Sequence, residues 1–243
     1  GDYSHCFDHG AWRPGTVSSA LMSLRWQQWA VTDIGTRRAQ NEDAIVLRDD
    51  VQLWAVIDGL GGQDTGTVAS AALAHALVHL SLSPQLADAC DQLDDVLLAV
   101  HEQIHAFSQA QEPSRLVGAT VGVLRATATW CLFVWVGDVR LYRLRNGQFS
   151  LLSQDHIDES GNLTRLIGTD EPLPDALVLR AQAGDRYLLC SDGLHAQVPE
   201  NRIQYWLARD PVIALRELVA EALVAGGRDN VSMVLLEASN GEN

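Results

Sequence analysis

The chain has 243 residues, of which 47% are hydrophobic and 20% charged, which is enough for one large globular domain with a substantial core. Its 31 acidic and 17 basic side chains give a formal net charge of −14, which disfavours nucleic acid or an anionic membrane as the main partner. No apolar run approaches the roughly 18 residues of a membrane span, so we expect a cytoplasmic protein.

The first residues of the chain differ from the rest in their sequence pattern. Residues 1–21 show neither helical nor strand periodicity, and we interpret them as an added or upstream extension without a catalytic role. Residues 22–243 are expected to form a single domain. In its first part, the apolar pattern predicts strands at 26–34, 44–47 and 52–57 and helices at 65–80 and 91–109.

After Gly118 the pattern becomes that of β structure. Strands are predicted at 119–124, 129–136, 139–144 and 148–152, and Asn146-Gly147 is a strong hairpin turn. Further strands are predicted at 177–181, 186–190 and 231–237, with helices at 199–209 and 211–225. Because the connections are short, we expect an α+β fold with helices packed on mainly antiparallel sheets.

The four cysteines lie far apart, without the C-x-x-C spacing of zinc ribbons or thioredoxin-type redox motifs. Three of them lie in apolar patterns, and we interpret these as reduced core thiols of a cytosolic protein. The cysteines are Cys6, Cys90, Cys131 and Cys190.

Aspartates recur at predicted strand ends and turns, most clearly in Val56-Ile57-Asp58-Gly59-Leu60-Gly61-Gly62. Asp and Gly are common in ordinary turns, so each position alone carries little weight. Several carboxylates at one sheet edge would repel one another, by roughly 4 kcal/mol for two charges about 4 Å apart at an effective dielectric near 20. A hard divalent cation would relieve that repulsion. The positions are Asp43, Asp58, Asp138, Asp192 and Asp229.

Carboxylate and carbonyl ligands without His or Cys point to Mg²⁺ or Mn²⁺ rather than zinc. Two such ions close together can activate a water molecule and clamp a phosphoryl group for in-line attack. Arg38, four residues before Glu42, would supply a guanidinium fork for phosphate oxygens. The alternative for Arg38 is an ordinary surface arginine beside Arg37.

Seven motifs, in order from about residue 29 to residue 237, resemble those of the metal-dependent PP2C-type (PPM) protein phosphatases in their bacterial form. Together they form a highly specific signal. The motifs are Gly35-x-x-Arg38-x-x-Asn41-Glu42-Asp43, Val56-Ile57-Asp58-Gly59-Leu60-Gly61-Gly62, Gly118-Ala119-Thr120, Val136-Gly137-Asp138-Val139-Arg140, Gln154-Asp155-His156, Leu189-Cys190-Ser191-Asp192-Gly193-Leu194 and Gly227-Arg228-Asp229-Asn230-Val231.

The resemblance implies a four-layer α-β-β-α sandwich with two Mn²⁺ or Mg²⁺ ions at one edge of the sheets. Asp58 would bridge the ions, Asp192 and Asp229 would complete one site, and the Gly59 carbonyl with Glu42 would help the other. A third, weaker ion would lie at Asp138 and Asp192, and Arg38 would bind substrate phosphate. Asp43 and Asn230 would support these ligands from behind.

The activity that the resemblance implies is hydrolysis of phosphoserine and phosphothreonine in proteins. A hydroxide bridging the two metals would attack directly, with Asp58, Arg38 and Asp192 as the catalytic residues and no phospho-enzyme. The expected partner is a phosphoprotein that is the target of a bacterial Ser/Thr kinase, and the protein is expected to be a monomer in the cytoplasm.

Three positions depart from the family pattern. Leu60 stands where animal members carry a histidine proposed as the general acid, and leucine has no proton to transfer. Thr67 replaces a glutamate that is common in the helix after the glycines. The region between His156 and Leu163 is much shorter than the usual flap over the active site, which concerns substrate selectivity.

Three other functions remain as alternatives. His101-Glu102-Gln103-Ile104-His105 matches the H-E-x-x-H signature of a zinc metalloprotease, but Ser108 and Gln111 stand where the extended signature needs Gly and a third His. A dinucleotide-binding loop is weaker, because Asp64 replaces its third glycine. The last alternative is a non-catalytic, phosphatase-like binding module.

Overall fold

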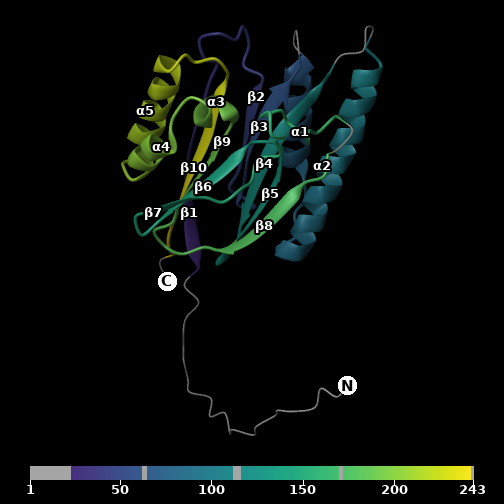
Figure 1. Ribbon diagram of the computed structural model, residues 1–243. Coiled ribbons are helices and arrows are strands. Elements are labelled where there is room, and N and C mark those ends of the chain that lie inside the picture. Colours follow the sequence, from purple (N-terminus) through teal and green to yellow (C-terminus); the bar gives the residue numbers. More distant parts are fainter. Residues whose placement is uncertain (1–22, 62–64, 112–115, 170–171, 242–243) are drawn as a thin grey trace, which may run out of the picture.

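Two stacked β-sheets with helices on both outer faces make up the fold, as Figure 1 shows. The computed structural model describes residues 23–61, 65–111, 116–169 and 172–241. The expected extension at residues 1–21 therefore lies outside the described residues, as do Gly62 and Asp64. The layers follow the order helix, sheet, sheet, helix, which confirms the expected four-layer sandwich.

Each sheet has five strands, and every pairing between the named strands is antiparallel. The first sheet has the order β1 (Leu24–Asp33), β10 (Val231–Asn240), β9 (Arg186–Cys190), β6 (Arg140–Arg145) and β7 (Gln148–Leu151). The second has the order β2 (Asp43–Arg48), β3 (Leu53–Leu60), β4 (Gly118–Ala126), β5 (Trp130–Val136) and β8 (Asp175–Arg180).

The helices divide between the two outer faces (Figure 1). Two of them cover the second sheet, namely α1 (Thr65–His79) and α2 (Leu86–Gln109). Three cover the first sheet, namely α3 (Asp192–His195), α4 (Glu200–Leu207) and α5 (Pro211–Val224). None of the described helices is both long enough and apolar enough to cross a membrane.

Strand β3 illustrates why both faces of a sheet are buried. Leu53, Ala55 and Ile57 pack against the layer of α1 and α2, whereas Trp54 and Val56 pack between the two sheets. All five are fully buried, and burial of a large apolar side chain contributes about 1.5–3 kcal/mol. The strand therefore reads as a continuous apolar run that ends in the buried Asp58.

The predicted strands and long helices are all present, with shifted ends. Helix α2 begins at Leu86 rather than at residue 91, and its buried Ala89 extends the apolar face in that direction. Strand β3 continues past Asp58 to Leu60, so Asp58 lies within a strand and not in the turn that follows it. The short helix α3 was not predicted. The hairpin turn is confirmed, with φ of 50° at Asn146 and 78° at Gly147.

Candidate active site

The five aspartates singled out from the sequence come to the same edge of the sandwich. Asp43 at the start of β2 is paired with Asp58 near the end of β3. Asp138 follows β5, Asp192 follows β9, and Asp229 precedes β10. Asp58 is only 8% exposed, and its burial, followed by the charges of the other four aspartates, raises its pKa well above the usual value. Asp58 is therefore buried, and half-buried carboxyl groups crowd around it.

The pKa values of neighbouring carboxyl groups are raised in the same way. Burial raises the pKa of Asp43 to about 7, helped by the charges of Asp192 and Asp229 and opposed by hydrogen bonds from Ser232 and Ser191. Burial also raises the pKa of Asp138 to about 7, with the charge of Asp192 as the next cause. Without a bound cation, it is therefore unfavourable for all of these carboxyl groups to be ionised at the same time.

The donor set fits hard divalent cations. Asp43 Oδ1 and Asp192 Oδ1 are buried and accept no hydrogen bond within the described residues, although Asp192 does share a hydrogen bond with Asp58. In the described ranges, no group of three or more His, Cys, Asp or Glu side chains is arranged so that it could hold a metal ion as it stands. Asp58 is nevertheless paired with Asp43 across β2 and β3 and shares a hydrogen bond with Asp192, and Mg²⁺ or Mn²⁺ commonly completes its shell with water and backbone carbonyls.

A carbonyl and a carboxylate converge beside Gly66, the second residue of α1. A Cβ on Gly66 would lie 2.7 Å from Glu42 Oε1 and 2.9 Å from the Gly59 carbonyl oxygen. A Cβ on Gly59 would lie 2.2 Å from the Gly66 carbonyl oxygen. Only glycine fits at either position, and their absent side chains leave the Glu42 and Gly59 oxygens close together.

Asn230 holds the loop that carries Arg38 and Glu42. Its side-chain oxygen accepts a hydrogen bond from the Glu42 N–H at 2.8 Å. Its amide nitrogen donates to the carbonyls of Ile34 at 2.9 Å and Gln40 at 3.0 Å. Because Asn230 is 2% exposed, these bonds tie both ends of the loop to the start of β10.

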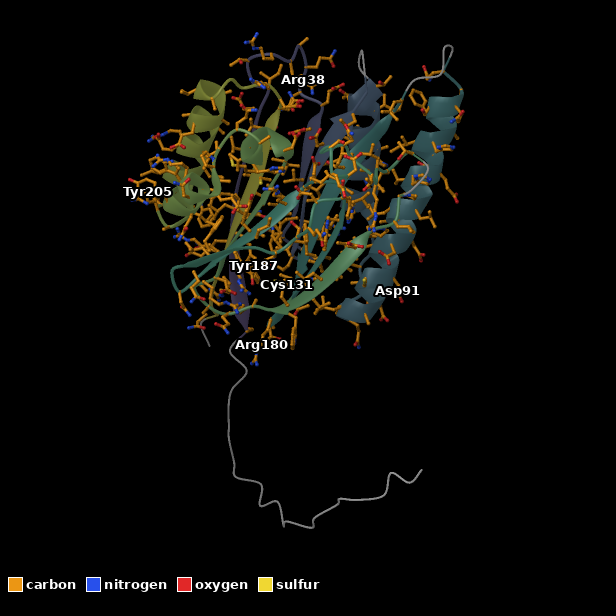
Figure 2. The ribbon with its side chains drawn as sticks, viewed as in Figure 1. Arg38, Asp91, Cys131, Arg180, Tyr187 and Tyr205 are labelled. Atoms are coloured by element: carbon orange, nitrogen blue, oxygen red, sulfur yellow. The ribbon has the colours of Figure 1, made fainter. Side chains whose placement is uncertain are left out.

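Arg38 lies over the cluster and remains open to solvent. Its Nη2 donates to Asp229 Oδ2 at 2.6 Å, and its Nη1 is 3.9 Å from Glu42 Oε2. The Arg38 side chain is 41% exposed, and it lies at the upper edge of the molecule in Figure 2. A guanidinium in this position can exchange its bond to Asp229 for a bond to an incoming phosphate.

The loop that carries Asp138 is fixed by residues outside the predicted site. His195 Nε2 donates to the Asp138 carbonyl oxygen at 2.9 Å. Burial, together with the charge of Arg140, lowers the pKa of His195 to about 4, so this imidazole is a neutral donor near pH 7. Arg140 in turn binds the Asp155 carboxylate at 2.7 Å. The sequence offers no signal for His195, because nothing local predicts that α3 lies against this loop.

The side chain of His156, which directly precedes the shortened flap in the chain, connects the Asp138 loop to the start of β8. Its Nδ1 accepts from the Gly137 N–H at 3.0 Å, so its Nε2 carries the proton and donates to Asp175 Oδ2 at 3.1 Å. The flap region is a closed turn in which Asp158 Oδ1 accepts from Ser160 and Asn162 N–H groups at 2.8 and 2.9 Å. The short segment is therefore a compact turn rather than an extended cover.

The geometry does not favour the zinc-protease alternative. His101 Nδ1 accepts from the Gly168 N–H at 3.0 Å, and His105 Nδ1 donates to the Gly168 carbonyl at 3.3 Å. Both histidines thus bind the backbone that leads away from the flap, and no third ligand joins them within the described residues. A dinucleotide-binding fold is also excluded, because β3 lies in an antiparallel sheet.

Comparison with known proteins gives a consistent result. The family model for protein phosphatase 2C matches residues 36–226. The serine/threonine protein phosphatase PstP of Mycobacterium tuberculosis is 31% identical over 90% of this chain, but only 46% of PstP is covered. The protein phosphatase PhpP of Streptococcus pneumoniae is 27% identical, with 85% of this chain and 95% of PhpP covered. The chain thus spans about half the length of the mycobacterial relatives.

Solved structures show the same fold. PppA, a key regulatory component of T6SS in Pseudomonas aeruginosa, superposes with a TM-score of 0.83 at 29% identity, covering 88% of this chain and 97% of PppA. The catalytic domain of PstP in complex with two manganese ions superposes with a TM-score of 0.80 at 30% identity, covering 90% of this chain and all of that domain. By its sequence, its fold and the family model it matches, this chain belongs to the protein phosphatase 2C family.

Proposed function

We propose that this protein is a phosphatase that hydrolyses phosphoserine and phosphothreonine in proteins and depends on Mn²⁺ or Mg²⁺. The observation that carries the proposal is the cluster of Asp192 and Asp229 around the buried Asp58, with Arg38 bonded to Asp229. The family supports the same activity, since its relatives PstP and PhpP are protein phosphatases.

The carboxylates have distinct roles in this proposal. Asp58, Asp192 and Asp229 would hold one cation, and Asp58 with the Gly59 carbonyl and Glu42 would hold the second. Asp138 and Asp192 would hold a third, weaker cation. Bound at these places, the cations would activate water for attack and neutralise charge on the transferred phosphoryl group. Arg38 would bind the phosphate oxygens and orient the phosphorus toward that water.

The side chains that are nucleophiles in other phosphatases are unsuitable here. Ser191 is fully buried, and its Oγ is taken up by a hydrogen bond to Asp43 Oδ2 at 3.1 Å and by another from the Ser232 N–H at 3.0 Å. Burial raises the pKa of Cys131 to about 12, and it also raises the pKa of Cys190, so neither supplies a thiolate near pH 7. Direct attack by water, without a phospho-enzyme, is the route these residues support.

Protonation of the leaving hydroxyl group must come from water or from another acid. Leu60 follows Gly59 at the end of β3 and has no proton to give. Thr67, where the family more often has a carboxylate, has a buried Oγ1 with no hydrogen-bond partner among the described residues. We therefore assign no side chain of α1 to proton transfer.

The cellular setting is part of the proposal. We infer a monomer in the bacterial cytoplasm that opposes a Ser/Thr kinase, with its catalytic domain at residues 22–243. The three described cysteines are free, which suits a reducing compartment. The relatives PhpP and PstP are themselves bacterial protein phosphatases.

Hydrolysis of a generic aryl phosphate with and without Mn²⁺ tests the proposal. The wild type should turn over only with the metal, and Asp192→Asn should be inactive because a shared ligand is lost. Metal-independent turnover, or an active variant, would refute the mechanism. A wild type that binds a phosphopeptide without hydrolysing it under any metal would identify a binding module instead.

A further inference from the structure

Two arginines beside the proposed site have no acidic partner. Arg37 precedes Arg38, and Arg228 precedes Asp229. Both side chains are exposed, and neither forms an ion pair or a side-chain hydrogen bond within the part of the chain that the structure describes. In a chain with 31 acidic against 17 basic residues, these two arginines place positive charge in the segments that carry Arg38 and Asp229, beside a site for anions.

The backbone brings these two arginines to the same rim. The Thr36 N–H donates to the Gly227 carbonyl at 2.8 Å, and Thr36 Oγ1 donates to the Gly226 carbonyl at 2.8 Å. Arg37 directly follows Thr36, and Arg228 directly follows Gly227, so the backbone segments that carry the two arginines are hydrogen-bonded to each other. The Arg228 stem lies over Gly226, with its Cγ 3.6 Å from the place of a Cβ there.

Several other arginines already have carboxylate partners. Arg140 binds Asp155 at 2.7 Å, Arg145 binds Asp185 at 2.6 Å, and Arg186 binds Glu237 at 2.6 Å. These pairs lie within the fold and link its strands. Arg37 and Arg228 are instead exposed to solvent, and they directly precede Arg38 and Asp229 in the chain.

We infer that Arg37 and Arg228 form a subsite for an acidic side chain next to the phosphorylated residue of the substrate. This inference rests on the proposed phosphatase function and names its substrate class. A guanidinium fork binds a carboxylate through two parallel hydrogen bonds. A local positive rim on an otherwise acidic protein also speeds the association of acidic segments.

The test compares two phosphoserine peptides that differ only in glutamate or glutamine at the flanking positions. With Mn²⁺ present, the wild type should show a kcat/KM for the glutamate peptide about five- to tenfold above that for the glutamine peptide, since each exposed pair contributes up to roughly fivefold. In the double variant Arg37→Gln/Arg228→Gln this ratio should fall to about one. Added salt should reduce the wild-type ratio.

Arg180→Gln is a control for the loss of a positive charge elsewhere on the surface. Arg180 is exposed at the end of the molecule opposite Arg38 in Figure 2, and its substitution removes one positive charge. It should keep the wild-type ratio. The unfolding temperatures of all variants should match that of the wild type, because the substituted side chains are exposed.

The outcomes separate the subsite from the proposed function. Equal kcat/KM for both peptides in the wild type, or an unchanged ratio in the double variant, overturns the subsite alone. If the ratio of kcat/KM between the two peptides also falls to about one in Arg180→Gln, the preference comes from net charge, and the subsite is overturned as well. If the wild type hydrolyses neither peptide with Mn²⁺, the proposed function itself fails, and the subsite fails with it.

Discussion

The two ends of strand β9 carry aspartates in opposite surroundings. Asp185, directly before the strand, is fully buried and satisfied: Arg145 donates to both of its oxygens at 2.6 Å, and Tyr187 Oη and the Gln182 N–H donate at 3.0 and 2.8 Å. Asp192, after the strand, has a buried oxygen without a hydrogen-bond partner in the described ranges, and it lies among other carboxylates.

We interpret this difference as that between a structural carboxylate and a carboxylate proposed to bind a cation. At the first end the protein supplies its own cation and donors, so the charge is balanced within the fold. At the second end the protein gathers several carboxylates, and the donors present leave Asp43 Oδ1 and Asp192 Oδ1 without a partner among the described residues. Such an arrangement is costly on its own, and it becomes favourable when divalent cations bind.

The largest expected effect is at the functional end. Asp58→Asn should lower kcat for a phosphopeptide by about 10³-fold or more, since electrostatic stabilisation by bound metal is worth several kcal/mol. The same change should raise the stability of the metal-free protein, because it removes one charge from the repelling cluster. Steady-state kinetics and thermal unfolding in a chelator measure the two effects. A variant that is less stable than the wild type in the chelator would contradict the repulsion.

The corresponding substitution of Asp185 should lower the stability of the protein, whereas Asp58→Asn should raise it. Asp185→Asn should reduce the free energy of unfolding by about 3 kcal/mol, because it leaves the Arg145 charge without its partner. Urea denaturation measures this loss. Activity per folded molecule should stay at the wild-type level, and a loss of activity comparable with that of Asp58→Asn would erase the distinction between the two ends.

The pH dependence sharpens the same comparison. Burial raises the pKa values of Asp43 and Asp138 from 3.8 to about 7, so the folded metal-free protein holds more protons than the unfolded chain between these values. Their contribution to stability is complete below about pH 4 and is lost as the pH rises through about 7. The rise in unfolding temperature on adding Mn²⁺ should therefore be larger at about pH 8 than at about pH 5. A larger rise at the lower pH would contradict this.

A smaller effect is expected at His195, which bonds the Asp138 loop to α3. His195→Leu should weaken the proposed third Mn²⁺ site roughly fivefold, the effect of losing one neutral hydrogen bond. His195→Gln, which keeps a donor, should restore most of that affinity. Calorimetric titration with Mn²⁺ measures both variants, and equal weakening in the two would assign the loss to packing rather than to the bond.

Removal of residues 1–21 should have the smallest effect. Deletion should leave the kinetics of phosphopeptide hydrolysis unchanged, because the proposed ligands all lie between Arg38 and Asn230. A parallel assay of the full and shortened chains measures this, and a large loss of activity would show that the extension takes part in catalysis.

The elements that were predictable from sequence are those set by local pattern. Strand β3 is marked by its apolar run, and the hairpin at Asn146 and Gly147 by residues that tolerate positive φ. The carboxylates were found because strand ends and glycines mark them, and because their motifs resemble a family. Helix α3 has only four residues, too few to show a helical period, and it was missed.

Contacts between distant parts of the chain could not be predicted from the local sequence pattern. Asn230 binds the Glu42 backbone across 188 residues, and His195 binds the Asp138 carbonyl across 57. The H-E-x-x-H match at His101 and His105 was ambiguous for the same reason. Only the fold shows that both rings bind the backbone of Gly168.

Calorimetric titration of the wild type and Asp58→Asn with Mn²⁺ tests the central claim most directly. If the carboxylates at the end of β9 and its neighbours are gathered for cations, the wild type should bind two Mn²⁺ ions tightly and a third more weakly, and Asp58→Asn should lose both tight sites. A wild type that binds no Mn²⁺, or a variant that binds it as the wild type does, would contradict the account.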